Sequence, residues 1–297
     1  MTERRPRRRR YVLALTGMAR PDQLALVCVV YALGVLVAVA RGATHANVLV
    51  GVGALLVVAV AVHYANEYAD YDTDALTTRT PYSGGSGALH DADLGRPFAR
   101  RALVGASVLA VLALLATVVA GVPASATALL SAILVVGVAY SLGPRLAWRG
   151  LGEVTNAVLG GLALPLYGVA VTGTAPDVVD ALTFLPFTAI VFANLLATQW
   201  PDRRADAHVG KRTLAVILDA HTLRRLYVLA AALGLGGVGA LVATGLAPLA
   251  LLALATPTAV LLAVGARRYG RTESPAATVH AMLVLAFAYV LTAACVW

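Results

Sequence analysis

The stretch ANVLVGVGALLVVAVAVHYANEYADYDTD, residues 46–74, decides the fold class of this chain. It carries no charged residue before Glu67, and this apolar part matches the ~20 residues that a helix needs to cross a ~30 Å hydrocarbon core. Its end is rich in polar and acidic residues. The stretch therefore predicts a helix that crosses a membrane and emerges in a cluster of acids.

Similar apolar segments recur along the whole chain. Of its 297 residues, 60% are hydrophobic and 13% are charged, whereas about 25% are charged in an ordinary soluble domain. Nothing alternates as the strands of a membrane barrel do. We predict an all-α polytopic membrane protein, with about nine transmembrane helices in a bundle around a central cavity. The expected spans are 22–41, 46–67, 102–121, 124–142, 154–173, 180–200, 224–244, 247–266 and 277–297.

The positive charges predict the orientation of these spans. If the chain crosses the membrane nine times, each of its 23 basic residues except Arg41 falls on the side of the N-terminus. Cytoplasmic loops of membrane proteins carry the excess of Lys and Arg, so that side is expected to be the cytoplasm. We expect a multi-pass protein of the plasma membrane, with its N-terminus and its acidic loops in the cytoplasm.

The N-terminal segment is the most basic part of the chain. We expect residues 1–20 to form a disordered, basic cytoplasmic tail and residues 21–297 to form one transmembrane domain. The run RRPRRRR at residues 4–10 would suit nucleic acid or anionic lipid. Because a membrane domain follows it, we favour membrane lipid as the partner and expect no nucleic acid.

Two rows of acidic residues stand out from the apolar background. In the first acid row, Asn66, Asp70 and Asp74 are spaced by four residues, which stacks their side chains on one face of a helix. In the second acid row, Asp202 and Asp206 repeat this spacing. Six of the chain's 15 acidic residues lie in these two segments, and this concentration indicates a functional site.

Aspartates brought together in this way would repel one another unless cations balanced them. Ligand sets made of oxygen alone favour Mg²⁺, with Mn²⁺ as a substitute. Mg²⁺ usually shares its coordination shell with substrate phosphates, so we predict a diphosphate held between the two rows. Nearby basic residues could neutralise a departing diphosphate. These residues are Arg79, Arg145, Lys211 and Arg212.

At these residues the chain resembles the UbiA superfamily of intramembrane aromatic prenyltransferases. The segment NEYADYDTD at 66–74 is similar to the family's N/D-x-x-x-D-x-x-x-D motif. The segments DRRAD at 202–206 and GKRT at 210–213 are similar to its second motif. Between them, AYSLGPRLAWRGLGE at 139–153 resembles the family's cytoplasmic tyrosine-containing loop. The resemblance runs over almost the whole chain, including the nine spans.

The resemblance implies roles for the residues of both rows. The four aspartates would bind Mg²⁺ and, through it, the diphosphate of a polyprenyl donor, while Asn66 would help to hold the metal or the phosphate. Ionisation of the donor would leave an allylic cation that an electron-rich acceptor attacks, and aromatic side chains would tolerate its charge. Tyr140 is assigned to the diphosphate site. The candidates for the acceptor and prenyl pocket are Tyr64, Tyr68, Asn156, Asn194 and Thr198.

Two positions depart from the family's pattern. The middle loop often has a Lys four residues after its Tyr, where this chain has Pro144 followed by Arg145. Whether Arg145 replaces that Lys is left open. Thr198 stands where an Asn or Asp often precedes the second row. Pro201 is expected to distort the helix at the start of this row.

Two further features belong to or follow the first row, and a third precedes the first span. The glycine-rich segment TPYSGGSG at 80–87 could be a flexible connector or a phosphate-cradling turn, and its position favours a loop over the site. Glu67 lies on a different helix face from the row and could belong to the site or to a solvated helix end. Arg20 could meet an acidic acceptor, but we expect it to anchor the first span.

The sequence thus predicts a prenyltransferase that moves a polyprenyl group from a prenyl diphosphate to an aromatic quinone precursor within the membrane. A dihydroxynaphthoate acceptor of the menaquinone pathway is slightly favoured, because NEY at 66–68 and AWRGLGE at 147–153 look more like that branch. One alternative is the same chemistry on a non-aromatic lipid acceptor. Another is a cation-coupled secondary transporter, whose acids would be expected near the middle of the spans.

Overall fold

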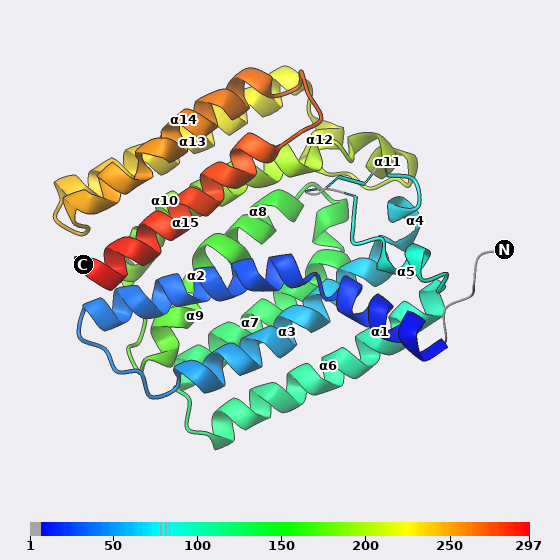
Figure 1. Ribbon diagram of the computed structural model, residues 1–297, viewed down its shortest axis with the longest axis horizontal. Helices are drawn as coiled ribbons and strands as arrows, with labels where there is room; N and C mark the ends of the chain where they lie inside the picture. The colour runs from blue at the N-terminus through cyan, green and yellow to red at the C-terminus, as the bar shows by residue number, and fades with distance from the viewer. Residues whose placement is uncertain (1–6, 78, 81, 83) are drawn as a thin grey trace.

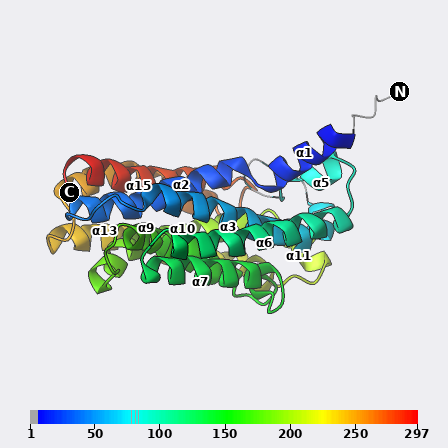
Figure 2. The ribbon, with the colours of Figure 1, turned by 90° about the horizontal axis from the view of Figure 1, so that it is seen from below.

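Long helices that run roughly side by side make up most of the molecule (Figures 1 and 2). The computed structural model describes residues 7–77, 79–80, 82 and 84–297. Within these residues the regular structure is helical, apart from one isolated bridge between Arg149 and Arg212. Nine candidate membrane spans occur in this part of the chain. The prediction of an all-α polytopic membrane protein is therefore confirmed, while the central cavity stays a prediction.

The long helices follow the expected spans closely. They are α2 (Pro21–Ala40), α3 (Val48–Ala69), α6 (Arg96–Val119), α7 (Ala124–Ser141), α10 (Val178–Gln199), α13 (Ala220–Ala243), α14 (Leu249–Arg268) and α15 (Ala276–Cys295). One further span, Gly152–Val171, is assembled from α8 (Gly152–Val158), a π-helical turn (Leu159–Ala163) and α9 (Leu164–Val171).

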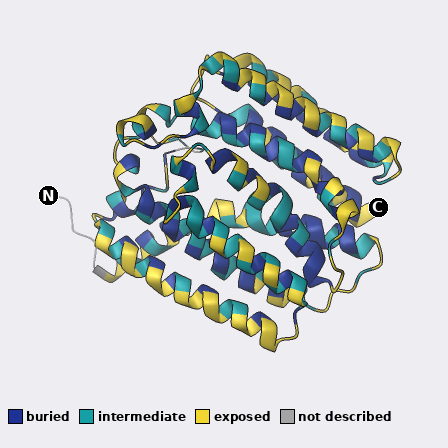
Figure 3. Ribbon diagram, turned by 180° about the vertical axis from the view of Figure 1, so that it is seen from behind, coloured by how far each residue is buried: buried dark blue, intermediate teal, exposed yellow. Residues whose placement is uncertain are grey.

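Helix packing separates an inner set from an outer set. Helix α2 packs between α9 and α15, and α10 packs against α13 and α15. Helices α6 and α14 are mostly exposed, as Figure 3 shows for the outer faces of the bundle. Beyond Arg101, the exposed side chains of α6 are apolar, which suits contact with lipid. They include Val104, Val108, Leu112 and Leu115.

Close helix approach fixes the crossing of the inner helices. Gly161 lies in the π-helical turn, and a Cβ there would stand only 2.6 Å from the Cα of Thr188 on α10. Gly34 on α2 and Gly168 on α9 likewise face backbone atoms of the opposite helix. Small residues that let backbones approach are the usual basis of helix association in membranes.

The short helices gather at one end of the bundle, which we call the acid end (Figure 1). These are α1 (Arg7–Met18), α4 (Tyr71–Asp74), α5 (Ala88–Asp91), α11 (Arg203–His208) and α12 (Leu214–Ile217). The helices that precede and follow them in the chain bring them to this end. Arg41, the one basic residue predicted on the other side, lies at the opposite end, where it forms an ion pair with Asp180 at 2.8 Å.

The expectation of a disordered tail is wrong for its described part. Residues Arg7–Met18 form α1, in which Ala14 and Met18 are fully buried. Arg10 donates hydrogen bonds to the backbone of Ala92 and to Asp93, next to α5. The physical reason is that the run after the arginines is apolar enough to pack against α3 and α5. Residues 1–6 lie outside the described residues.

Candidate active site

The first acid row lies where α3 leaves the apolar part of the bundle. Asn66 is in the last turn of α3, Asp70 ends it, and Asp74 ends the short helix α4. The backbone N–H of Asp70 donates to the carbonyl of Asn66 at 2.8 Å, and that of Asp74 donates to Asp70 at 2.8 Å. This helical hydrogen bonding continues past the end of α3, so the row keeps the shared face that its spacing predicts.

The second acid row lies on a separate short helix. Helix α10 ends at Gln199, Pro201 lies in the following turn, and Asp202 precedes α11. The distortion predicted at Pro201 is confirmed, and it redirects the chain so that this row approaches the first one. Asp206 is buried, with only 2% of its surface exposed.

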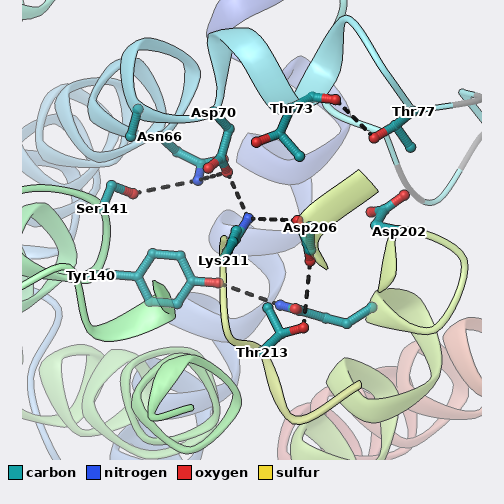
Figure 4. Close-up of polar contacts among 12 residues, drawn as sticks. Asn66, Asp70, Thr73, Thr77, Tyr140, Ser141, Asp202, Asp206, Lys211 and Thr213 are labelled. Atoms are coloured by element: carbon teal, nitrogen blue, oxygen red, sulfur yellow. Dashed lines mark hydrogen bonds and ion pairs between the residues drawn. The ribbon is translucent and has the colours of Figure 1, made fainter. Parts of the chain in front are cut away.

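Lys211 joins the two rows (Figure 4). Its Nζ lies 3.1 Å from Oδ2 of Asp70 and 3.5 Å from Oδ1 of Asp206. Burial alone would lower the pKa of this lysine, but the attraction of Asp70 and Asp206 raises it above its ordinary value. Lys211 is therefore a fixed positive charge between the rows.

The rows still carry more negative charge than Lys211 balances. Burial, together with the charges of Glu67 and Asp70, raises the pKa of Asp74 to about 7. Burial and the charge of Asp206 raise the pKa of Asp202 to about 6. Oδ1 of Asp202 and Oδ1 of Asp206 are buried without a hydrogen-bond partner. Such crowded carboxylates are stabilised by an added cation.

The donor set suits a cation that completes its shell with a ligand. Among the described residues, no three His, Cys, Asp or Glu side chains are placed to hold a metal ion by themselves. Instead, carboxylates face one another from two rows. Oδ1 of Asp202 has no partner, and Oδ1 of Asp206 has only its ion pair with Lys211. Because Mg²⁺ is usually bound by a few carboxylates and by substrate phosphates, this arrangement fits Mg²⁺ better than an all-protein metal cage.

Polar side chains next to the predicted site residues complete the site. They are Ser141, Gln199 and Thr213, which the sequence does not predict as site residues. Nδ2 of Asn66 donates to Asp70 at 2.9 Å and lies 3.4 Å from Oγ of Ser141. Thr213 donates to Asp206 at 3.4 Å. Nε2 of Gln199 donates to the hydroxyl of Tyr140 at 3.5 Å. Ser141 and Thr213 each lie within two residues of a predicted site residue, and this proximity was the available signal.

The glycine-rich segment lies over both rows, as its position in the sequence favours. The backbone N–H of Gly84 donates to Oδ2 of Asp202 at 3.2 Å. Gly85 has a φ of 66°, and a Cβ there would collide with the carboxylate of Asp74. Only glycine tolerates this conformation at such close range. Residues 81 and 83 of the segment lie outside the described residues.

The other predicted cations do not contact the acid rows in the described part of the chain. Arg79 pairs with Asp91 at 2.9 Å. The guanidinium of Arg145 lies 3.5 Å from the ring centre of Trp148. Arg212 is exposed, and its backbone N–H lies 3.4 Å from the carbonyl of Trp148. Of the four basic residues predicted at the site, Lys211 forms ion pairs with the acid rows, whereas Arg79, Arg145 and Arg212 have other contacts.

The predicted pocket residues lie in different surroundings. The hydroxyl of Tyr64 donates to the Leu15 carbonyl, and Arg96 lies over the ring of Tyr68. Asn156 is exposed, whereas Asn194 is buried and its Oδ1 has no hydrogen-bond partner. The hydroxyl of Thr198 lies 3.3 Å from the carbonyl oxygen of its own helix at Leu195. Their role in a pocket stays a prediction.

A buried acid, Glu153, adds a contact that the sequence does not predict. It lies in the first turn of α8, is fully buried, and accepts a hydrogen bond from the backbone N–H of Leu214 at 2.7 Å. Leu214 begins α12, directly after Thr213. Glu153 therefore ties the chain that carries Lys211 to the start of α8.

A polytopic helical bundle with two acid rows at one end is the arrangement that the resemblance to intramembrane prenyltransferases implies. The model of the UbiA prenyltransferase family matches residues 25–291, which is most of the chain. The chain therefore belongs to the UbiA prenyltransferase family, and the prediction that it is a prenyltransferase is confirmed. This membership, and acids at helix ends, speak against the alternative of a secondary transporter.

Solved structures share the fold at low sequence identity. A digeranylgeranylglyceryl phosphate synthase matches with a TM-score of 0.68 and 12% identity, over 96% of this chain and 99% of its own. A UbiA homologue from Archaeoglobus fulgidus bound to GPP and Mg²⁺ matches with a TM-score of 0.68 and 12% identity, over 95% of this chain and 100% of its own. A UbiA homologue from Archaeoglobus fulgidus bound to DMAPP and Mg²⁺ matches with a TM-score of 0.68 and 13% identity, over 95% of this chain and 99% of its own. No curated protein sequence matches the chain significantly.

Proposed function

We propose that this chain transfers a polyprenyl group from a prenyl diphosphate to an aromatic quinone precursor, in a Mg²⁺-dependent reaction within the membrane. The observation that carries the proposal is the meeting of two acid rows around Lys211, with Oδ1 of Asp202 buried and left without a hydrogen-bond or ion-pair partner. The proposal is also supported by similar structures that contain GPP or DMAPP together with Mg²⁺.

The four aspartates of the two rows would hold the metal ion, for which Mn²⁺ is a proposed substitute. When bound, the metal supplies positive charge that stabilises the diphosphate as it leaves. Asn66, supported by Ser141, keeps Asp70 oriented toward the second row. Holding the Asp70 carboxylate in one orientation favours catalysis, because a protein contributes to this chemistry mainly through positioning and preorganised charge.

Lys211 is the proposed direct cation for the diphosphate. It is buried, remains charged, and already lies between the rows. Tyr140, next to Ser141 and hydrogen-bonded to Gln199, would line the same site. Arg79, Arg145 and Arg212 are proposed to act at its rim, where exposed charge attracts an anion over a longer range.

The reaction proceeds by cleavage of the bond between the first carbon of the prenyl chain and the diphosphate oxygen. The diphosphate keeps the electron pair, and a ring carbon of the acceptor attacks the allylic cation to form the new carbon–carbon bond. Loss of the proton from that ring carbon restores aromaticity, so the products are prenylated acceptor, diphosphate and a proton. Burial of the allylic cation among the helices keeps water from attacking it in place of the acceptor.

The acceptor would bind on the membrane side of the acid rows. The proposed pocket residues are Tyr64, Tyr68, Asn156, Asn194 and Thr198. Asn194 is the best supported, because its buried oxygen has no partner and could accept a hydrogen bond from an acceptor hydroxyl. A dihydroxynaphthoate is the favoured acceptor. A second candidate, a glycerol-phosphate lipid, is suggested by the similarity to a digeranylgeranylglyceryl phosphate synthase.

The orientation follows from the positive charges. We propose that the acid end faces the cytoplasm of the cell, with the chain in the plasma membrane, because the basic residues gather at that end and Arg41 lies at the other. A water-soluble diphosphate would then be released into the cytoplasm. Labelling of single cysteines introduced at Arg204 and at Thr174 in intact cells, in a variant with Cys28 and Cys295 replaced by Ser, tests this. The cysteine at position 174 alone should react with an impermeant reagent.

Product analysis tests the proposed function. The purified protein in lipid nanodiscs would be supplied with one long prenyl diphosphate, Mg²⁺ and a panel of acceptors: dihydroxynaphthoate, 4-hydroxybenzoate and a glycerol-phosphate lipid. We expect a prenylated aromatic product by mass spectrometry, which disappears when EDTA replaces Mg²⁺. A product from the glycerol-phosphate lipid alone would contradict the aromatic acceptor. Binding of prenyl diphosphate that is indifferent to Mg²⁺ would contradict the metal-dependent site.

A further inference from the structure

Glu67 differs from the acids of the two rows because both of its oxygens are engaged by residues outside the rows. It is buried, with 2% of its surface exposed. Its Oε1 accepts hydrogen bonds from Nε and Nη2 of Arg20, at 2.9 and 2.6 Å, and from the backbone N–H of Ser86 at 3.2 Å. Its Oε2 accepts from Oγ of Ser86 at 2.7 Å. A buried carboxylate is tolerated when it is paired and hydrogen-bonded in this way.

Arg20 reaches Glu67 from an unusual backbone conformation. It joins α1 to α2 with a φ of 52° and a ψ of 71°, in the left-handed region that residues other than glycine rarely adopt. Pro21 begins the next helix directly after it. The guanidinium that pairs with Glu67 therefore extends from a sharp bend between two helices, which fixes the position of Arg20.

Ser86 belongs to a segment that we call the glycine loop, residues Gly84–Gly87. Three consecutive residues of this loop contact three different parts of the site. Gly84 donates its N–H to Asp202 in the second row, Gly85 lies against Asp74 in the first row, and Ser86 is held by Glu67. Glu67 and Asp202 are thus the two points between which the loop is fixed.

We propose that Glu67 is a positioning residue, which, together with Arg20 and Ser86, holds the glycine loop against both acid rows and so preforms the binding site for the donor's diphosphate. The inference rests on the proposed function, because it presumes a prenyl diphosphate between the rows. It assigns Glu67 no contact with the metal or the donor, since both of its oxygens already accept hydrogen bonds from Arg20 or Ser86. Its positioning effect passes through the backbone of the loop and is separate from the repulsion between its charge and that of Asp74.

A second arginine–carboxylate pair, between α1 and the residues after α5, provides a matched control. Arg10 pairs with Asp93 at 3.1 Å, and Asp93 is almost fully exposed. This pair also links an N-terminal arginine to a carboxylate beyond the loop, but it has no contact with the glycine loop or the acid rows in the described residues. Asp93→Asn therefore removes an arginine–carboxylate pair without loosening the loop, and asparagine suits the left-handed φ of 50° at that position.

The test combines hydrogen exchange with kinetics on full-length protein in nanodiscs, using Glu67→Gln, Ser86→Ala and Asp93→Asn. In Mg²⁺-free protein, we expect the amides of the glycine loop to exchange roughly tenfold faster in the first two variants, with α3 unchanged. With a prenyl diphosphate and Mg²⁺, we expect the donor's KM to rise about tenfold in Glu67→Gln while kcat stays within about twofold. Asp93→Asn should match the wild type in both measurements.

Ser86→Ala keeps the inference testable if Glu67→Gln destabilises the fold, because it removes one hydroxyl contact only. Unchanged loop exchange in Ser86→Ala, or an unchanged donor KM in Glu67→Gln, would overturn the inference. A change that Asp93→Asn reproduces would overturn it as well, because general attachment of α1 would then be the cause. Failure of the wild-type protein to consume any prenyl diphosphate would instead refute the proposed function, and the exchange data would still decide the role of Glu67.

Discussion

The two acid rows have the same spacing but are built differently. The first continues the hydrogen bonding of a transmembrane helix, and Asp70 in it is engaged by Asn66 and Lys211. The second begins a new helix after Pro201, and both of its aspartates keep an oxygen without a hydrogen-bond partner. Asp206 resembles Asp70, because Lys211 and Thr213 engage it, whereas Oδ1 of Asp202 has neither a hydrogen bond nor an ion pair. Equal spacing therefore does not give equal ligands, and Asp202 is the least committed of the three for a cation.

The largest effect is expected from removing a carboxylate of either row. Asp70→Asn and Asp206→Asn should each lower turnover by about 10²–10³-fold, because charge stabilisation of the leaving diphosphate is lost. Diphosphate release measured over a range of Mg²⁺ concentrations checks this. Because the uncommitted oxygen belongs to Asp202, Asp202→Asn should raise the half-saturating Mg²⁺ concentration more than Asp70→Asn does. The opposite order would contradict the comparison.

A smaller loss is expected from neutralising the residue that joins the rows. Lys211→Gln should lower donor turnover by roughly 10–100-fold, because a charge-assisted contact to the diphosphate disappears and Asp70 faces Asp206 without compensation. Lys211→Arg retains the charge and serves as the control, with a loss that should be clearly smaller. Steady-state assays with a varied donor measure both. Equal losses in the two variants would show that the geometry of Lys211 matters and its charge alone does not.

The second row should also destabilise the metal-free protein. The pKa of Asp202 is about 6 in the folded protein and 3.8 in the reference state, so the folded state binds more protons and stability falls as pH rises through this range. Asp202→Asn should therefore raise the apparent melting temperature in EDTA by a few degrees above pH 7, with little gain at pH 4. Thermal unfolding at several pH values measures the difference. A gain independent of pH would contradict the stated cause.

The smallest effect is expected outside both rows. Arg145→Ala should lower turnover by less than about threefold, because its guanidinium stacks on Trp148 and reaches neither row. The same assay as for Lys211 applies. A loss as large as that of Lys211→Gln would make Arg145 a direct ligand of the diphosphate, in the role of the family's usual lysine.

The sequence predicts the transmembrane helices well because length and hydropathy suffice for them. The expected span 46–67 corresponds to Val48–Ala69, and 124–142 corresponds to Ala124–Ser141. Errors concentrate at the acid end, where α6 already begins at Arg96 although its span was expected from residue 102. Arginines at helix ends extend toward water and are compatible with a helix, so charge is a poor marker of where a helix begins.

The acid rows were predictable, but the contacts that complete the site were not. Four-residue spacing fixes a helix face, and a proline marks the break before Asp202. Nothing in the spacing indicates that Gly84 donates to Asp202, or that Arg20 and Ser86 engage both oxygens of Glu67. Such contacts depend on loops returning from distant positions, which a periodic pattern does not encode. The prediction of a disordered tail is wrong for a related reason, because the apolar half of this segment gains partners only in the folded bundle.

Binding of a prenyl diphosphate is the measurement that tests the central claim most directly. Calorimetric titration of the wild type, Asp70→Asn and Asp206→Asn with a non-hydrolysable donor analogue would be performed with Mg²⁺ and with EDTA. We predict binding by the wild type only when Mg²⁺ is present, and a strong loss of binding in both variants, because the two rows form one site. Wild-type affinity retained in either variant, or affinity unaffected by EDTA, would contradict the account.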